Sequence, residues 1–421
     1  MKEIQPKKPV DTKVSVPGSK SMTHRALITA GLAHGESHLL GFLECEDTRY
    51  TANALKELGV RISTEGDKLL VSGVGGKFQH SPRRKEIFLG NSGTSYRLLL
   101  SVVGLTRGEF LITGSPRMNE RPISDLVGAL NQLGVEASYV NQEGFPPVLI
   151  KARGIAGGKV ELPGRQSSQY VSSLLLSAPY AKGDIEIEVR GELVSKPYVD
   201  LTLDVMEQFG VRFVREGYSY FRVASGQKYG PRHFTIEGDV SSASYFWAAA
   251  AVTGGTITTE GIRPFATRQG DVDFLRVLEE MGCRVEKQTD RVIVRGGGLS
   301  GIDADMGSMP DMVPTLAAVS LFAHGRTAIR NVAHLRYKES DRLSSITLEL
   351  GKLGGLIEEL PDGLIIHGGG PLSGAVVDPN DDHRIAMSLA VVGSRVPGIK
   401  IAEARCVNKS FPQFWEMWDR F

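Results

Sequence analysis

The sequence of 421 residues has few cysteines and almost no net charge. Its three cysteines, Cys45, Cys283 and Cys406, lie far apart, which argues against a disulfide framework and against a cysteine zinc site. Lys and Arg (49) nearly balance Asp and Glu (48), so any attraction for anions must come from local clusters of charge. This balance argues against a nucleic-acid coat, and we expect no nucleic-acid partner.

Membrane and metal signatures are also missing. No apolar run approaches the roughly 18 residues that a membrane-spanning helix needs, and the start MKEIQPKKPV lacks the apolar stretch of a secretory signal. The nine histidines form no His-Glu-x-x-His pattern, and no P-loop is present. The sequence therefore predicts a cytoplasmic protein with no membrane partner, no metal site and no cofactor.

Two glycine patterns repeat along the chain with spacings of 70 to 76 residues. In the first, a glycine opens an alternating strand after an apolar helical run, at positions 35, 108, 183, 255, 325 and 398. In the second, a glycine ends an amphipathic helix, at positions 59, 134, 210, 282 and 354. A hairpin-like pair of runs follows, and a further strand leads into the next repeat. The pattern predicts six βαβαββ repeats.

The repeats divide naturally into two sets of three. The last repeat ends at Phe421 without its hairpin, whereas the chain begins with a lone strand around Lys13 to Val16. We therefore expect this N-terminal strand to complete the final repeat. A polar stretch near 230 to 240 marks the second crossing between the sets. The sequence predicts an α/β protein with two domains, 20–237 and 1–19 plus 238–421, whose two crossings form a hinge.

Polar and charged residues gather where the helices of the repeats begin. A helix start offers free N–H donors and a partial positive charge, which suits anions. The candidates before the first helices are Lys20, Ser21, Arg25, Asn91, Gly93, Thr94, Arg97, Ser167, Ser168, Gln169, Asp311 and Arg384. Those before the second helices are Arg121, Ser195, Lys196, Tyr198, Lys338, Glu339, Arg342 and Lys409. Cations clustered with a few carboxylates suit multiply anionic substrates and proton transfer.

These residues also have a purely structural interpretation. Arg25, Arg97 and Arg342 could merely pair with carboxylates on a helix. Ser167 and Ser168 are ordinary helix caps, and Glu339 could belong to a solvated first turn, where acids are favoured.

Nine motifs resemble, in order, those of the 5-enolpyruvylshikimate-3-phosphate synthase family of enolpyruvyl transferases. They are PGSKSMTHRAL, LGNSGTSYRLL, PRMNERPI, SSQYVSSLLLSAP, LVSKPYVD, GDVSSASYFWAAA, RYKESDRL, DDHRIAMSLA and NKSFPQFW. The match covers essentially the whole chain. The resemblance implies an inside-out α/β barrel fold, with two domains of three βαβαββ units that close over substrate.

The resemblance also implies a reaction in the shikimate pathway to chorismate and the aromatic amino acids. The enolpyruvyl group of phosphoenolpyruvate passes to the 5-hydroxyl of shikimate 3-phosphate, and phosphate leaves, by addition and elimination through a tetrahedral intermediate. Asp311 would take the hydroxyl proton, and Glu339 and Lys20 are both candidates for the acid at C3. The residues implied for phosphoenolpyruvate are Lys20, Gly93, Arg121, Gln169, Arg342, Arg384 and Lys409. Those implied for shikimate 3-phosphate are Lys20, Ser21, Arg25, Ser167, Ser168, Gln169, Ser195, Tyr198, Asp311 and Lys338.

Three other functions remain as alternatives. The enolpyruvyl transferases that act on UDP-N-acetylglucosamine resemble this repeat but typically carry a loop cysteine and an early Lys-Asn pair. This chain has Lys20-Ser21 and no cysteine between Cys45 and Cys283. An RNA 3'-phosphate cyclase would need nucleotide chemistry, and a non-catalytic repeat scaffold would not explain the charges at the junctions. We expect a monomer that binds only small-molecule substrates.

Overall fold

The computed structural model describes residues 1–9, 11–79 and 83–421, and the chain divides into two compact units. The N-terminal unit is Lys20–Ile236, and the C-terminal unit joins Met1–Ser19 to Glu237–Phe421. Each unit has its own hydrophobic cluster. The chain therefore passes between the units twice, once before Lys20 and once after Ile236.

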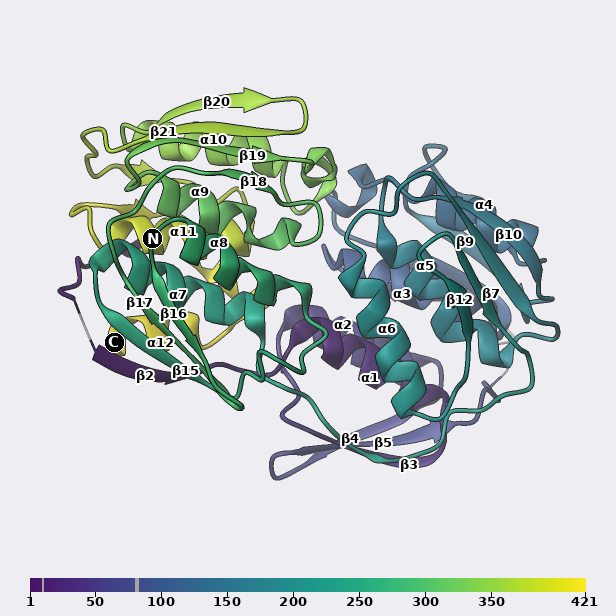
Figure 1. The fold of residues 1–421 in the computed structure, drawn as a ribbon. Helices are drawn as coiled ribbons and strands as arrows, with labels where there is room; N and C mark the ends of the chain where they lie inside the picture. The colour runs from purple at the N-terminus through teal and green to yellow at the C-terminus, as the bar shows by residue number, and fades with distance from the viewer. Residues whose placement is uncertain (10, 80–82) are drawn as a thin grey trace. The chain divides into compact units, whose positions relative to one another are not determined.

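The N-terminal unit consists of three repeats (Figure 1). The first contains α1 (Lys20–Leu32), β3 (His34–Leu40), α2 (Glu46–Glu57), β4 (Arg61–Glu65) and β5 (Lys68–Val74), with β14 (His233–Thr235). The second contains β6 (Lys85–Phe88), α3 (Gly93–Gly104), β7 (Arg107–Thr113), the 3-10 turn η1 (Met118–Glu120), α4 (Ser124–Gln132), β8 (Glu136–Tyr139) and β9 (Val148–Arg153). The third contains β10 (Gly158–Pro163), α5 (Ser168–Ser177), the turn η2 (Ala178–Tyr180), β11 (Ile185–Arg190), α6 (Pro197–Gln208), β12 (Val214–Glu216) and β13 (Tyr220–Val223).

The C-terminal unit repeats the same plan. Its first repeat contains β2 (Asp11–Ser15), α7 (Val240–Thr253), β15 (Thr256–Glu260), η3 (Gly270–Asp273), α8 (Phe274–Glu280), β16 (Arg284–Lys287) and β17 (Arg291–Arg295). Its second contains β18 (Asp303–Asp305), η4 (Pro310–Met312), α9 (Val313–Ser320), β19 (Gly325–Arg330), η5 (Ala333–Tyr337), α10 (Arg342–Lys352), β20 (Leu356–Leu360) and β21 (Gly363–Gly368). Its last contains β1 (Lys2–Glu3), β22 (Val376–Val377), α11 (His383–Gly393), β23 (Lys400–Ile401), η6 (Ala404–Lys409) and α12 (Phe414–Arg420).

The sheets share one strand order. A leading strand pairs in parallel with the next strand of its repeat, and the hairpin adds antiparallel on the other side, as in β6-β7-β9-β8 and β10-β11-β13-β12. The last sheet has the three strands β1-β23-β22. The predicted fold class, an α/β protein of six βαβαββ repeats, is confirmed.

One strand assignment made from the sequence is wrong. The strand β2 does not complete the final repeat. It pairs in parallel with β15, with Asp11 opposite Thr256 and Ser15 opposite Glu260, while β1 fills the edge of the last sheet. The reason is length, because the two-residue strands β22 and β23 cannot offer β2 the five-residue ladder that β15 provides. Likewise β14, at the end of the N-terminal unit, leads the sheet of its first repeat.

The two helices of each repeat are buried differently. The first helices, α1, α3, α5, α7, α9 and α11, are buried along almost their whole length, whereas the second helices bury one face. The second helices α2, α4, α6, α8 and α10 each end two residues before a glycine with positive φ, as predicted, for example Gly59 (98°) and Gly282 (111°). This conformation favours glycine because it lacks a Cβ.

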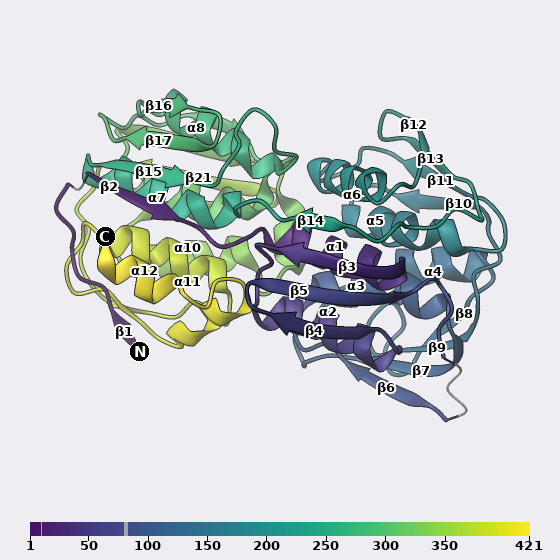
Figure 2. The ribbon, with the colours of Figure 1, turned by 90° about the horizontal axis from the view of Figure 1, so that it is seen from below.

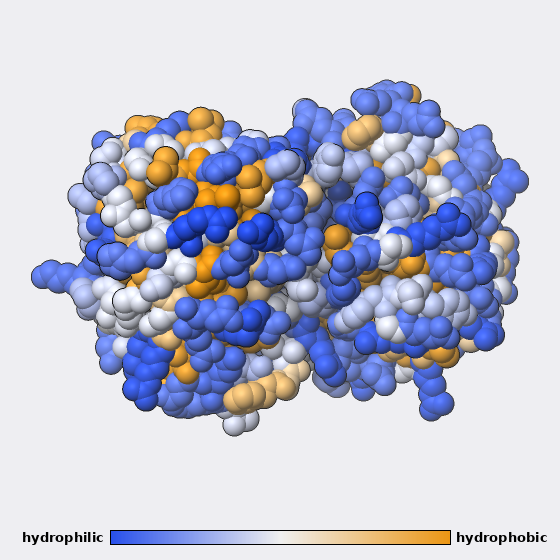
Figure 3. Space-filling view, turned by 45° about the horizontal axis from the view of Figure 1, so that its top comes forward, coloured by the Kyte–Doolittle hydropathy of each residue, from blue (hydrophilic) through white to orange (hydrophobic). Residues whose placement is uncertain are grey.

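The sheets lie outside the buried helices in each unit (Figure 2). Their hairpin strands alternate between buried and partly buried side chains, which fits sheets with one face toward solvent. Hydrophilic residues cover much of the visible surface, and apolar residues reach it in scattered patches (Figure 3). Within the described residues, no helix is long and apolar enough to cross a membrane.

Candidate active site

Lys20 is the first residue of α1 and forms a buried ion pair. Its Nζ lies 3.1 Å from Oδ2 of Asp47, in the first turn of α2. The two residues are 9% and 1% exposed. A buried ammonium ion needs such a partner because desolvation of an isolated charge is costly. Asp47 holds the Lys20 side chain, although the sequence did not single it out.

Arg25 lies one turn later on α1 and is surrounded by neutral oxygen atoms. Its guanidinium donates to Thr202 Oγ1 (2.7 Å), to the carbonyls of Ser21 (2.9 Å) and Tyr198 (3.0 Å), and to Ser172 Oγ (3.4 Å). Burial lowers the pKa of Arg25 to about 10. Among the described residues, no carboxylate pairs with it, so the predicted carboxylate-pairing role of a helix arginine does not apply here. The site is a buried cation that a bound anion would neutralise.

Arg121 and Gly93 are in close contact in the second repeat. Arg121 Nη1 donates to the Asn91 carbonyl (3.0 Å) and to Asn91 Oδ1 (3.2 Å) at the start of α3. A Cβ added at Gly93 would lie 2.5 Å from Arg121 Nη2. Gly93 therefore leaves the space that the buried guanidinium occupies.

Gln169 joins two repeats at the start of α5. Its Oε1 accepts from Arg97 Nη1 (2.9 Å), and its Nε2 donates to Thr94 Oγ1 (3.1 Å). Ser167 caps α5 by accepting from the Gln169 N–H (3.2 Å), and Ser168 is buried beside it. Arg97 thus bonds an amide rather than a helix carboxylate, and Ser167 retains the structural role expected of a cap, whereas Ser168 is the first residue of the helix.

Ser195 has a left-handed backbone, with φ of 53°, just before α6. Its carbonyl accepts from the Tyr198 N–H (3.1 Å), and the Tyr198 carbonyl in turn accepts from Arg25. A non-glycine residue in this region is strained, and such strain is frequent at functional sites. The structure thereby links Ser21, Arg25, Ser195 and Tyr198 into one cluster.

Arg342 is the centre of a charge network in the C-terminal unit. It lies 2.8 Å from a carboxylate oxygen of each of Asp311, Glu339 and Asp382 and is 1% exposed. Burial alone would lower the pKa of Arg342, but these carboxylates together raise it above its ordinary value. Glu339 is 8% exposed, so it does not belong to a solvated first turn.

Arg384 and Lys409 complete this network. Arg384 Nη2 donates to Asp311 Oδ2 (2.7 Å), so the carboxylate of Asp311 lies between two guanidinium groups. Lys409 Nζ lies 4.0 Å from Glu339 Oε1. Asp382 caps α11 by accepting from the Arg384 N–H (3.0 Å) and so fixes the first turn of that helix. Five of the predicted residues, Asp311, Glu339, Arg342, Arg384 and Lys409, therefore meet.

Lys338 borders the network at the end of η5. It precedes Glu339 directly, and its charge acts on His334, a buried residue of the same turn. Desolvation first, and then the charge of Lys338, lower the pKa of His334 to about 3. His334 is therefore neutral at ordinary pH.

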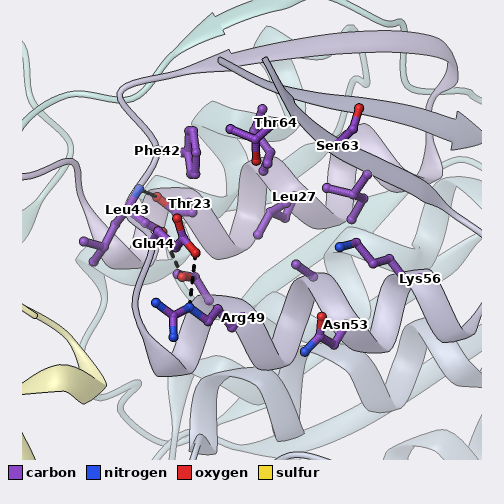
Figure 4. Close-up of a pocket in the computed structure, with 14 residues that line it drawn as sticks. Thr23, Leu27, Phe42, Leu43, Glu44, Arg49, Asn53, Lys56, Ser63 and Thr64 are labelled. Atoms are coloured by element: carbon purple, nitrogen blue, oxygen red, sulfur yellow. Dashed lines mark hydrogen bonds and ion pairs between the residues drawn. The ribbon is translucent and has the colours of Figure 1, made fainter. Parts of the chain in front are cut away.

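A pocket of about 270 Å³ opens elsewhere in the N-terminal unit (Figure 4). Leu27 and Phe42 contribute apolar surface, and α2 contributes Arg49, which lies 3.3 Å from Glu44, and Lys56. None of the residues predicted to bind substrate lines this pocket. Within the described residues, no group of three His, Cys, Asp or Glu side chains is placed to hold a metal ion.

Sequence reasoning missed the partners of the predicted residues. Asp47, Ser172, Thr202 and Asp382 are all buried and bond to predicted cations. Asp382 lies inside the DDHR motif, two residues before the predicted Arg384, so its position directly before a helix was a usable signal. Ser172 and Thr202 lie in apolar helical runs, where only the fold brings them to Arg25.

Comparisons with known proteins point to one family. The sequence model described as EPSP synthase (3-phosphoshikimate 1-carboxyvinyltransferase) matches residues 4–418. The chain is 46% identical over 421 residues to a 3-phosphoshikimate 1-carboxyvinyltransferase of Syntrophobacter fumaroxidans, with 100% of this chain and 99% of that protein covered. It is 45% identical over 416 residues to the Vibrio vulnificus protein of the same name, with 98% and 97% covered. A solved EPSP synthase from Acinetobacter baumannii has a TM-score of 0.81 and 28% identity, with 99% and 97% covered.

Proposed function

The chain belongs to the EPSP synthase family, and from this premise we propose that it transfers the enolpyruvyl group of phosphoenolpyruvate to the 5-hydroxyl of shikimate 3-phosphate. The family's reaction uses these two substrates and releases phosphate. It is a transferase reaction of the shikimate pathway, and the match over the full chain supports it here.

The burial of the cationic side chains is the structural observation that supports the proposal. Burial of a cation is unfavourable because the charge is desolvated, and a nearby negative charge, such as that of a bound anion, can offset this cost. Each cation that the resemblance assigns to substrate is nevertheless at most 9% exposed, apart from the half-buried Lys338. The buried set is Lys20, Arg25, Arg121, Arg342, Arg384 and Lys409.

We assign shikimate 3-phosphate to the N-terminal unit's cluster around Arg25. Arg25 offers a positive charge that the described residues do not neutralise, which favours an anionic ligand. The hydroxyls of Ser21, Ser167, Ser168 and Ser195, the amide of Gln169 and the phenol of Tyr198 can pair with phosphate and ring hydroxyl oxygens.

We assign phosphoenolpyruvate contacts within each unit by itself, at Gly93 in the N-terminal unit and around Glu339 in the C-terminal unit. Arg121 presents a guanidinium beside Gly93, and Gln169 belongs to the adjoining repeat. Arg342, Arg384, Lys409 and Lys20 supply further positive charge. A carboxylate and a phosphate on one small molecule require several fixed cations, and the planar fork of arginine binds both groups in a bidentate manner.

Asp311 is the proposed base for the 5-hydroxyl. In the first step, the hydroxyl oxygen attacks C2 of phosphoenolpyruvate, its proton passes to Asp311, and C3 receives a proton. In the second step, C3 loses a proton and the bond from C2 to the phosphate oxygen breaks. Arg342 and Arg384 orient Asp311 through its two oxygens, and a bound anion that draws these guanidinium groups away would free the carboxylate to accept a proton.

The proton at C3 has two candidate donors. Lys20 is held by Asp47, and Glu339 is held by Arg342 and lies near Lys409. Both groups are buried beside groups of opposite charge.

Phosphate release tests the proposed reaction. The purified chain should release phosphate from phosphoenolpyruvate when shikimate 3-phosphate is the acceptor, and should not do so with UDP-N-acetylglucosamine. Release with UDP-N-acetylglucosamine alone would assign the chain to the other transferase. Absence of release with either acceptor would reject the proposed reaction.

A further inference from the structure

Asp271 is a buried carboxyl group in η3 that none of the assigned roles uses. The residue is 5% exposed. Its Oδ2 accepts a hydrogen bond from Ser241 Oγ, and its Oδ1 is buried without a hydrogen-bond partner among the described residues. No described cation pairs with it. A buried carboxylate in this state is costly, so the group calls for a functional explanation.

The fold places Asp271 beside the charge network of the C-terminal unit. Ser241 and Tyr245 lie four residues apart on α7 and so share one face of that helix. Ser241 holds Asp271, and the Tyr245 hydroxyl accepts from Arg384 Nη1 (3.4 Å). Arg384 in turn binds Asp311 (2.7 Å). Two neighbouring positions of α7 therefore contact Asp271 and Arg384, the partner of Asp311.

The turn that carries Asp271 is fastened to the start of the same helix. The Val240 N–H donates to Gln269 Oε1 (3.1 Å), and Gln269 Nε2 donates to the Gly238 carbonyl (2.8 Å). Asp271 therefore has a fixed position rather than that of a loose loop residue.

Charged groups on the neighbouring elements surround Asp271. Asp239 comes from the start of α7, Asp311 from η4 and Arg384 from α11. On α8, Arg276 and Glu280 pair with each other at the surface (2.6 Å). Burial first, and then the charge of Asp311, raise the pKa of Asp271 to about 7, against the opposing effect of Arg384.

We propose that Asp271 is a positioning residue for the anion site of the C-terminal unit, which binds its anion tightly only while Asp271 is uncharged. A second negative charge beside Asp311 competes with the incoming anion for Arg384 and Arg342. The inference rests on the proposed function, since it concerns the cations assigned there to phosphoenolpyruvate. It makes the protonation of a residue outside the substrate contacts control substrate affinity.

Asp271→Asn tests this role because the amide copies the uncharged carboxyl group. The matched control is Asp273→Asn, an exposed position in the same turn. Affinity for inorganic phosphate, measured by calorimetry at pH 6.5 and 8.5, probes the cations without any turnover, and the KM for phosphoenolpyruvate is measured in parallel. We expect wild-type affinity to fall more than that of Asp271→Asn over this interval, by roughly tenfold for one added charge at short range in protein. The ionisation of the ligand itself cancels in the comparison.

Thermal unfolding without ligand provides a second readout. A carboxyl group whose pKa is raised in the folded state contributes stability below its unfolded pKa of 3.8 that is lost as pH rises to about 7. Asp271→Asn should therefore unfold several degrees above wild type at pH 8, with a smaller difference at pH 5. Asp273→Asn should match wild type at both.

The outcomes separate this inference from the proposed reaction. Equal pH dependence of phosphate affinity in wild type and Asp271→Asn overturns the inference, whether or not the chain turns over substrate. Lower stability of Asp271→Asn at every pH, with an unchanged pH dependence, identifies a structural carboxyl group and also overturns it. If Asp271→Asn does not fold, Ser241→Ala replaces it. Loss of the Ser241 hydrogen bond raises the pKa of Asp271 further, so the fall in phosphate affinity must move to higher pH, and an unmoved fall rejects the inference.

Discussion

The cations of the two units differ in what surrounds them. In the N-terminal unit, Arg25 donates only to hydroxyl and carbonyl oxygens, and Arg121 donates to Asn91. In the C-terminal unit, Arg342 and Arg384 bond to carboxylates. The N-terminal unit thus holds Arg25 among neutral oxygen atoms and pairs Lys20 with a single carboxylate, whereas the C-terminal unit holds cations and acids in one network.

This difference indicates a division of labour. A buried cation with neutral partners costs stability until an anion arrives, which suits tight binding. A network in which carboxylates share guanidinium groups is already compensated, so an arriving anion can redistribute its bonds and change which carboxylate accepts a proton. We therefore expect substitution of Arg25 to weaken binding and substitution of Asp311 to reduce turnover.

Asp311→Asn should have the largest effect. The amide keeps the shape of the side chain but loses the charge that accepts the hydroxyl proton, and general base catalysis contributes about a hundred- to ten-thousand-fold in rate. Steady-state phosphate release should fall by that range, while calorimetry shows shikimate 3-phosphate binding largely intact. Asp303→Asn, which alters an exposed ion pair with Arg330 in the same repeat, serves as the control. Near-normal turnover of Asp311→Asn would remove this residue from the mechanism.

Arg25→Met should weaken shikimate 3-phosphate binding by about ten- to a hundredfold, because a charged hydrogen bond to the ligand is lost. Stability should stay constant or rise, since burial already lowers the pKa of Arg25 to about 10 and Thr202 keeps its bond to Ser172 (2.9 Å). Calorimetric titration and urea unfolding measure the two effects. Arg61→Met, at an exposed position of the same unit, is the control. Unchanged affinity in a folded variant would contradict the assignment.

The repeats could be predicted from the sequence because they depend on local signals. Gly59 and its counterparts stop a helix through their own backbone conformation, so their spacing reveals the repeat directly. The partner of β2 could not be predicted in this way. Strand pairing between residues some 245 positions apart, such as Thr12 and Ile257, is decided by which sheet edge remains open in the folded unit.

The candidate site shows the same limit. Cations at helix starts were visible in motifs such as RYKESDR, but their partners were not. Thr202 reaches Arg25 only because α1 and α6 pack together, and Asp271 reaches the network only through α7. Ionisation of buried groups depends on these tertiary neighbours, so it is absent from any local pattern.

His334→Asn tests whether burial and the nearby positive charges of Lys338 and Arg342 keep His334 unprotonated in the folded chain. Desolvation, with Lys338 and Arg342 adding to it, lowers the pKa of His334 to about 3. Below pH 6.5 the unfolded chain therefore takes up a proton that the folded chain does not, and stability falls with pH until about pH 3. Between pH 8 and pH 5 the wild type should lose about 2 kcal/mol relative to His334→Asn. Urea unfolding at both values measures this, with the exposed His324→Asn as background. A parallel loss in both chains would show that His334 takes up its proton in the folded state.

Gly93→Ala should have the smallest effect and the most selective one. The added Cβ would lie 2.5 Å from Arg121 Nη2, and the guanidinium, anchored to Asn91, must move to admit it. Gly93 begins α3 without a positive φ, so the backbone tolerates alanine and stability should not fall. We expect the KM for phosphoenolpyruvate to rise by roughly three- to tenfold, as for a modest displacement of one charged contact, with shikimate 3-phosphate affinity unchanged.

Gly128→Ala is the matched control, because this helical glycine in α4 has no atom within 4 Å of the added Cβ. An unchanged KM in Gly93→Ala would show that Arg121 does not bind phosphoenolpyruvate, whereas equal losses for both substrates would mean that the N-terminal unit does not separate the two ligands.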